Sequence, residues 1–122
     1  MKVKVFTDGF DGHVRRSLDR AKRMERGERL EPEKIITFED PLHMLQCLTA
    51  NRMRLCQVAR KKRLSISALA VELGRNRGSV TRDVNTLKRF GLIRLREQVN
   101  PGHGKVQIVE PIAQRIEMRA AL

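Results

Sequence analysis

A short polar segment in the second half of the chain has the residue types and spacing of a nucleic-acid contact. Arg82, Asn85 and Arg89 follow one another at intervals of three and four, which places their side chains on one face of an α-helix. Arginine can donate two hydrogen bonds to guanine O6 and N7, and asparagine can bond adenine in the same bidentate way. Gly78 and Ser79, which precede them, would let the backbone come close to a ligand. The segment therefore indicates contact with double-stranded DNA.

The sequence evidence for catalysis, metal binding or redox chemistry is weaker than that for the nucleic-acid contact. The sequence has no paired carboxylates, Ser/His/Asp order or phosphate-cradling glycine loop, so we expect no enzyme and no catalytic residue. His43 and Cys47 are four residues apart and could share a metal ion, but no second pair completes the four ligands of a structural zinc site. We expect these two to pack, and predict no metal and no cofactor. A redox switch at Cys56 is a similarly weak hypothesis.

The positive charge is concentrated in one part of the chain. The 122 residues include 26 Lys or Arg and 14 Asp or Glu, a formal net charge of +12. Residues 1–46 carry ten basic and nine acidic residues, whereas residues 47–122 carry sixteen and five. Such a field attracts nucleic acid or an anionic membrane surface. Three of the four Phe, the only aromatic residues, lie outside the basic region, which favours a duplex over stacked single-stranded bases.

Length and composition exclude several classes of protein. No apolar run is long enough for a transmembrane helix or a secretory signal, so we expect no membrane partner. Hydrophobic residues make up 40% and are spread along the chain, which is enough for a modest core. The two cysteines lie nine residues apart without a Cys-x-x-Cys pair, which favours a reduced, cytoplasmic protein.

Residues 1–39 are predicted to form a strand–helix–strand extension. Residues 2–6 alternate apolar and polar side chains, an amphipathic helix follows and ends at Gly27, and residues 34–38 form the second strand. The apolar residues of that helix are Phe10, Val14, Leu18, Ala21 and Met24. Two strands alone leave unpaired edges, so the extension must pack on the rest of the chain or on another copy. We expect it to mediate a homodimer, with contact of residues 1–38 to a different protein as the alternative.

Residues 40–110 are predicted to contain four helices and a hairpin. Pro41 opens the first helix, the second runs from after Thr49 to about Arg63, and the third is capped by Ser65 and stops at Gly74. The fourth, at about 76–90, has an apolar stripe of Val80, Val84 and Leu87. The third and fourth helices, joined by a tight turn, form a helix-turn-helix unit.

Alternation resumes after the fourth helix and predicts a hairpin at about 94–109, with a turn at 100–104. After it, Pro111 with Ile112, Ile116 and Ala120 predicts a terminal helix over 111–122. We expect Ile112 and Ile116 of that helix to join the strands near Val3–Phe6 and Ile35–Phe38 in the dimer contact.

In this order of elements, residues 40–110 resemble the winged-helix transcriptional regulators of prokaryotes, particularly MarR-like DNA-binding proteins. The resemblance rests on Leu64–Arg75 (LSISALAVELGR), Val80–Leu87 (VTRDVNTL) and Phe90–Ile93 (FGLI). It implies that the second helix of the motif enters the major groove and that the hairpin, or wing, touches phosphate or the minor groove. The expected fold class is α+β: a winged helix-turn-helix domain with an N-terminal strand–helix–strand extension.

The expected DNA contacts lie on the recognition helix and the wing. They are Arg75, Asn76, Arg77, Gly78, Ser79, Thr81, Arg82, Asn85 and Arg89 on the helix and its preceding turn, and Arg94, Arg96, His103 and Lys105 on the wing. Free amides at the helix start would also favour a phosphate at Asn76–Gly78. As an alternative to DNA contact, Arg82 could form an ion pair with Asp83 or Glu72. Arg89 and the basic run 61–63 could stabilise the C-terminal ends of their helices without touching DNA.

The function expected from these residues is that of a sequence-specific, double-stranded DNA-binding transcriptional regulator, acting as a homodimeric repressor. One recognition helix reads a short half-site, so two copies related by a two-fold axis multiply affinity and specificity. Two alternatives remain open. The chain could be the DNA-binding antitoxin of a toxin–antitoxin pair, or a nucleoid-type DNA binder without sequence preference.

Overall fold

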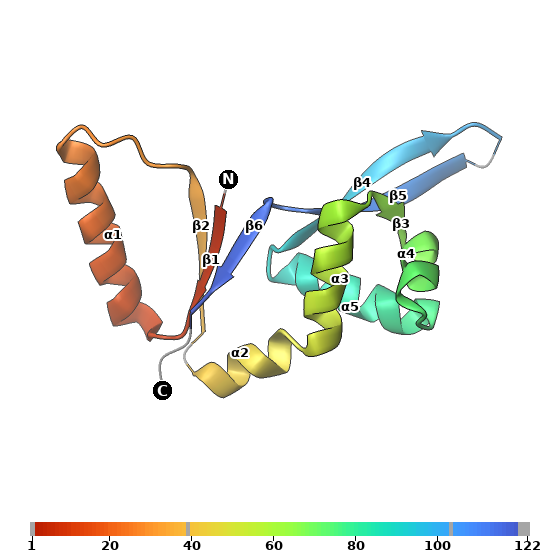
Figure 1. Cartoon of the computed structure of the whole chain (residues 1–122), viewed down its shortest axis with the longest axis horizontal. Helices are drawn as coiled ribbons and strands as arrows, with labels where there is room; N and C mark the ends of the chain where they lie inside the picture. The colour runs from red at the N-terminus through yellow and green to blue at the C-terminus, as the bar shows by residue number, and fades with distance from the viewer. Residues whose placement is uncertain (1, 39, 103, 120–122) are drawn as a thin grey trace. The chain divides into compact units, whose positions relative to one another are not determined.

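The computed structural model describes residues 2–38, 40–102 and 104–119 and divides the chain into two compact units (Figure 1). The first unit comprises residues 1–47 together with residues 113–122, and the second comprises Leu48–Ile112. In sequence, the second unit is therefore inserted between two parts of the first.

The first unit is built on a parallel three-stranded sheet of order β2-β1-β6. Its elements are β1 (Lys2–Phe6), α1 (Gly9–Glu25), β2 (Glu33–Thr37), α2 (Pro41–Cys47) and β6 (Arg115–Met118). Central strand β1 has Val3 and Val5 fully buried. Helix α1 is the crossover that joins β1 to its parallel neighbour β2, and it ends before Gly27, whose φ is 86°. The predicted strand–helix–strand extension is confirmed.

The predicted C-terminal helix is wrong, because residues Arg115–Met118 form strand β6. Ile116 lies opposite Val3 in the parallel register, and Lys2 pairs with Glu117 at 3.7 Å. The spacing of Ile112 and Ile116 suited a helix, but Arg115–Met118 also alternates polar and apolar side chains, and pairing with β1 selects the strand.

Strand β6 also changes the argument for a dimer. It occupies the side of β1 that β2 leaves open, so β1 is paired on both sides within its own chain. The expectation that Val3–Phe6 presents an unsatisfied edge to a second copy is therefore wrong. Helix α2, which we expected in the DNA-binding domain, groups with the first unit.

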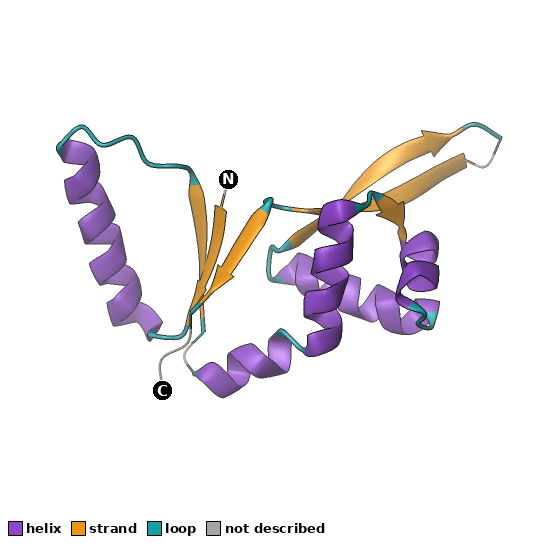
Figure 2. Ribbon diagram, viewed as in Figure 1, coloured by secondary structure: helices purple, strands orange, loops and turns teal. Residues whose placement is uncertain are grey.

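The second unit is a winged helix (Figure 2). Its elements are α3 (Ala50–Lys61), β3 (Leu64–Ser65), α4 (Ile66–Leu73), α5 (Arg77–Arg89), β4 (Ile93–Asn100) and β5 (Gly104–Pro111). The sheet is antiparallel with order β3-β5-β4, and β4 and β5 form the predicted hairpin. The two-residue strand β3, which was not predicted, holds the start of α4 against β5.

Local capping explains where the helices of this unit begin and end. The Thr49 side chain accepts a hydrogen bond from the Arg52 amide, and the Ser65 side chain accepts one from the Ala68 amide. Gly74 ends α4 with a φ of 63°, a conformation that costs little without a Cβ. These caps confirm the helix boundaries predicted at Thr49, Ser65 and Gly74.

Aliphatic side chains from the helices and the hairpin form the core of the second unit. The predicted stripe of α5 is fully buried, and Leu55, Leu69 and Ile93 are buried with it. Each such side chain contributes about 1.5–3 kcal/mol through removal from water. This core fixes the rotation of α5 and thus decides which of its residues stay exposed.

Candidate nucleic-acid interface

Burial of one face of α5 leaves its opposite face exposed. Arg82, Asn85 and Arg89 are all exposed, at the three- and seven-residue spacing that aligns them along the helix. Among the described residues, the side chains of Arg82 and Asn85 have no hydrogen-bond or ion-pair partner. Arg89 donates one hydrogen bond, 3.3 Å long, to the Thr86 hydroxyl. The structure thus brings these three predicted residues together on one surface.

The two carboxylates that could have neutralised Arg82 are engaged elsewhere. Asp83 accepts hydrogen bonds from Arg52 at 3.1 Å and from Arg75 at 2.7 Å. Glu72 pairs with Lys62 at 2.6 Å. The ion pairs weighed as the alternative for Arg82 are therefore not formed.

Asp83, Arg52 and Arg75 form a cluster that sequence reasoning missed. Their side chains are only 13%, 21% and 21% exposed, respectively. Arg52 comes from α3 and Arg75 from the turn before α5, so one carboxylate ties three segments of the motif together. Arg75, which we predicted to contact DNA, is turned to this cluster instead of lying on the exposed face.

The first turn of α5 is capped by its own chain. The Asn76 side-chain oxygen accepts hydrogen bonds from the amides of Gly78 at 2.7 Å and Ser79 at 3.4 Å. These two amides already have an acceptor in the cap, which weighs against the phosphate predicted at Asn76–Gly78. A Cβ on Gly78 would lie 3.0 Å from the same Asn76 oxygen, which gives this glycine a structural role.

The other predicted contact residues of α5 differ in their exposure and in the hydrogen bonds that they already form within the chain. Arg77 is exposed and its side chain has no partner within the described residues. Thr81 is half-buried, and its hydroxyl donates to the Arg77 carbonyl at 2.8 Å. Ser79 is also half-buried. Arg77 therefore joins Arg82 and Asn85 as side chains of α5 without a partner among the described residues.

On the wing, a single carboxylate holds two predicted arginines. Glu110 on β5 accepts from Arg94 Nε at 3.1 Å and from Arg96 Nε at 2.6 Å, both on β4. The hydrogen bond from Arg96 is the main reason that the pKa of Glu110 lies below its ordinary value. Because the bonds use Nε, the terminal guanidinium nitrogens of Arg94 have no partner within the described residues. Only a hairpin register that sets position 94 opposite position 110 could have revealed Glu110 from the sequence.

Two further predicted contacts, Lys105 and His103, lie near the turn of the wing in sequence. Lys105 is exposed and lies 3.8 Å from Glu97, a separation at which an exposed pair contributes little. His103, also predicted as a contact, lies outside the described residues.

The ion pairs leave the charge of the second unit unevenly neutralised. Leu48–Ile112 contains fourteen Lys or Arg and four Asp or Glu, and each of those acids is in an ion pair. Those pairs engage six cations, so within the described part of the unit eight cations form no ion pair. They are Arg54, Arg60, Lys61, Arg63, Arg77, Arg82, Lys88 and Arg89. Four of the eight are on α5, so this helix carries the largest share of unneutralised charge.

The basic run at the end of α3 has mainly local partners. Arg63 donates to the carbonyls of Ala59 and Arg60 in the last turn of the helix, and Lys62 pairs with Glu72. This favours the interpretation that Lys62 and Arg63 complement the helix end.

Cys56 and His43 are the remaining residues that the sequence suggested for redox or metal chemistry. Burial raises the pKa of the Cys56 thiol to about 11, which opposes the thiolate that a redox switch needs. The His43 ring makes an edge contact with Phe38, with 5.2 Å between ring centroids. In the described parts of the chain, no three His, Cys, Asp or Glu residues gather as metal ligands, and no helix is both long and apolar enough to cross a bilayer.

The three-helix core, the helix-turn-helix and the β4–β5 hairpin define the second unit as a winged helix-turn-helix domain. The HVO_A0114 family model matches residues 47–111, more than half of the chain, and the chain belongs to the HVO_A0114 family. The match coincides almost completely with the second unit. The MarR-like resemblance stays a prediction.

Two solved structures are similar in fold. One is a possible transcriptional regulator from Methanosarcina mazei Go1, with 19% identity and a TM-score of 0.49, over 57% of this chain and 62% of that chain. The chain thus spans less than two thirds of the length of the Methanosarcina protein. The other is the homodimeric winged helix-turn-helix DNA-binding domain of Mb0332 from Mycobacterium bovis, a possible ArsR-family transcriptional regulator. It shares 16% identity and a TM-score of 0.49, over 87% of this chain and 76% of that chain.

Both similarities concern the fold alone. A comparison with curated protein sequences finds no match.

Proposed function

We propose that this protein is a sequence-specific, double-stranded DNA-binding transcriptional regulator. The observation that carries the proposal is the exposed face of α5, where Arg82 and Asn85 have no partner within the described residues, on a helix with four cations that form no ion pair there. Both side-chain types can read base edges in the major groove. A helix that only packed on its neighbours would gain nothing from this concentration of charge.

The proposed contacts divide into two groups. Arg77, Arg82, Asn85 and Arg89 would face the groove, with Gly78, Ser79 and Thr81 near the point of closest approach. Arg94, Arg96, Lys105 and His103 would hold the wing on the phosphate backbone. Asn76 and Arg75 are proposed to position α5, because the cap and the Asp83 cluster occupy their side chains.

We propose a homodimer, with α1 as the surface between the copies. Its apolar residues point away from the sheet: Phe10 is 77% exposed and Leu18 is 58% exposed, whereas Gly12 on the opposite face is buried. An exposed apolar stripe of this kind is costly unless a partner covers it. The first turn of α1 carries Asp11 and the last turn carries Lys22, so an antiparallel second copy would bring opposite charges together.

Repression is the form of regulation we propose, since a bound dimer can block a promoter by occupancy alone. Such a protein would act on DNA in the cytoplasm as a binding protein and not as an enzyme. Its two free cysteines are consistent with that compartment.

The test is selection of bound duplexes from a random pool with the full chain. We expect enrichment of a palindrome whose half-sites lie about one helical turn, or about 10 bp, apart. Enrichment of a single half-site would contradict the dimer, and equal recovery of unrelated duplexes would favour the nucleoid-type binder. Co-purification with the product of an adjacent small gene would instead support the antitoxin alternative.

A further inference from the structure

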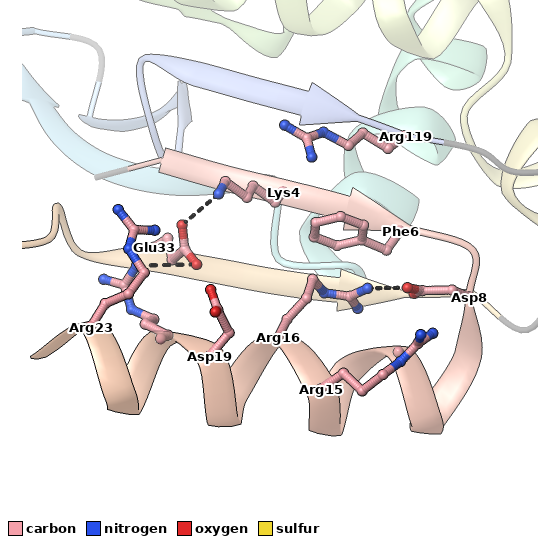
Figure 3. A pocket seen from close by; sticks show the side chains of 11 residues that line it. Lys4, Phe6, Asp8, Arg15, Arg16, Asp19, Arg23, Glu33 and Arg119 are labelled. Atoms are coloured by element: carbon pink, nitrogen blue, oxygen red, sulfur yellow. Dashed lines mark hydrogen bonds and ion pairs between the residues drawn. The ribbon is translucent and has the colours of Figure 1, made fainter. Parts of the chain in front are cut away.

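The first unit contains a charged cavity between α1 and its sheet (Figure 3). Its volume is about 460 Å³, within the usual range of small-molecule sites. Six lining side chains are Lys or Arg and three are Asp or Glu, and all lining residues belong to the first unit. The cavity is therefore complete without the winged helix.

One end of this cavity is close to neutral. Glu33 pairs with Lys4 at 3.0 Å and with Arg20 at 3.2 Å. Arg23 pairs with Glu28 at 2.7 Å, and this bond raises the pKa of Arg23, with a smaller contribution from the charge of Asp19. The cations at this end thus have acidic partners.

The other end has an excess of positive charge. Asp8 pairs with Arg16, and this hydrogen bond is the main reason that its pKa is lowered, so Asp8 stays ionised. Arg15 and Arg119 also line the cavity and form no ion pair among the described residues. Arg15 and Arg119 thus add two positive charges to this end that no described carboxylate pairs with.

Arg16 is only partly satisfied by this carboxylate. Its guanidinium carbon lies 3.5 Å from the centroid of the Phe6 ring, and its Nε and Nη2 are buried without a hydrogen-bond partner. The guanidinium carbon of Arg119 lies 5.9 Å from the same centroid. Leaving buried hydrogen-bond donors without acceptors is unfavourable. A bound anion would supply the acceptor that these two nitrogens of Arg16 lack.

The topology of the sheet puts this basic end where parallel sheets bind ligands. Phe6 is the last residue of β1 and Arg119 directly follows β6, so both lie at the carboxyl ends of neighbouring strands. From β1 the chain crosses through α1 to β2 on one side, while β6 lies on the other. Ligands of open α/β sheets bind in the crevice at such a point.

We infer that the basic end of this cavity binds a doubly charged oxyanion: phosphate, either free or as the phosphate group of a polar metabolite. Arginine forks bond phosphate oxygens in pairs, and two negative charges match the excess of Arg15, Arg16 and Arg119 over Asp8. The cavity is larger than phosphate alone needs, and Lys4 and Glu33 offer polar contacts to an attached organic group.

A nucleic-acid duplex fits this cavity less well. Asp19 and Glu33 line the concave surface and would repel a second row of phosphates. The favoured ligand is therefore a small molecule whose negative charge lies at the basic end, away from Asp19 and Glu33.

The experiment is titration calorimetry on the full chain at constant ionic strength, with three probes: inorganic phosphate, glucose 6-phosphate and a random 24-base-pair duplex. The variants are Arg16→Gln and Arg119→Gln, and Arg26→Gln is the control because Arg26 is an exposed arginine at the C-terminal end of α1 that does not line the cavity. Circular dichroism melting checks that each variant is folded. Arg119→Gln is the safer variant, because Arg119 is exposed and has no ion pair within the described residues.

We expect one phosphate per chain, and a loss of about tenfold or more in affinity for each cavity variant, the effect of removing a charge-assisted hydrogen bond. Arg26→Gln should bind within about twofold of the unchanged protein. Tighter binding of glucose 6-phosphate than of phosphate would show that the ligand is a phosphorylated metabolite, and the reverse order would show a site for the free ion. Absence of saturation by either anion at millimolar concentration, or equal losses in all three variants, would overturn the inference. Loss of duplex binding without small-anion binding would overturn it too and assign these arginines to DNA. The site does not depend on DNA recognition, so its failure would leave the proposed function standing.

Discussion

Asp83 on α5 accepts a hydrogen bond from Arg75 in the preceding turn, with 2.7 Å between Oδ2 and Nη2. The other carboxylate oxygen accepts from Arg52 on α3 at 3.1 Å. These two bonds make Arg75 part of the scaffold and keep Asp83 from pairing with Arg82. Affinity and stability should therefore respond differently to changes at these two arginines.

Asp83→Asn should lower the free energy of unfolding by about 1–3 kcal/mol, because it leaves two partly buried guanidinium groups without their counter-charge. Urea denaturation measures this change. Glu97→Gln is the matched control, since the pair of Glu97 with Lys105 is exposed, and it should change stability by less than about 0.5 kcal/mol. Equal effects of the two substitutions would show that the Asp83 cluster does not hold the motif together.

Arg82→Ala should weaken binding to a selected operator by about 1–3 kcal/mol and weaken binding to random DNA much less, because a base contact is lost. Lys105→Ala on the wing, at a proposed phosphate contact, should instead weaken both duplexes alike and reduce the salt dependence of binding. Fluorescence anisotropy at several salt concentrations separates the two outcomes. If Arg82→Ala also weakened both duplexes equally, Arg82 would be a phosphate contact only.

Glu110→Gln should destabilise the wing at neutral pH and have little effect in acid. The pKa of Glu110 is lowered in the folded protein from its ordinary value of 4.5. Its contribution to stability is therefore complete above about pH 4.5 and is lost as the pH falls through the folded-state pKa. The difference in stability between the two proteins should shrink as the pH falls below 4.5, and a constant difference would argue against the charge as the cause.

The Cys56 thiol should react slowly with iodoacetamide at pH 8 and faster as the pH approaches 11. Burial raises its pKa from 9.0 to about 11, so between these pH values the thiol is protonated in the folded state and ionised in the unfolded chain. Ionisation stabilises the unfolded chain, so this thiol lowers the free energy of unfolding as the pH rises above 9. Mass spectrometry of the modified peptide reports the rate, with urea-unfolded protein as the fast reference. Rapid modification of folded protein at pH 8 would reopen the redox hypothesis.

Leu18→Glu should convert the proposed dimer to a monomer without unfolding the chain, because Leu18 is exposed in the single chain and covered only in the dimer. Sedimentation at micromolar concentration measures the change. Arg29→Glu, at an exposed position beyond α1, should leave the assembly unchanged. A monomer before any substitution would contradict the proposed contact.

Much of the fold could be predicted because its signals are local. The stripe of Val80, Val84 and Leu87, the caps at Ser65 and Gly74, and the turn at 100–104 each need only a few neighbouring residues, and all are found in the structure. Strand β6 could not be predicted in the same way, because Ile116 fits a helix as well as a strand until β1 is beside it.

The same distinction applies to the candidate site. The exposed face of α5 follows from helical periodicity, whereas the partners of its charges do not. Asp83 is close to Arg82 in sequence yet binds Arg52, which is 31 residues away, and Glu110 holds Arg96 across the hairpin, 14 residues away. Ion pairs between distant residues depend on packing, which periodicity does not describe.

The pairing of β1 with β6 also has a consequence for synthesis on the ribosome. Val3 must wait for Ile116, because these register partners lie 113 residues apart in the sequence. The whole of Leu48–Ile112 leaves the ribosome before that sheet can close. The winged helix can thus mature first, while the first unit stays open until its last strand arrives, and a stalled nascent chain would expose β1 along one side.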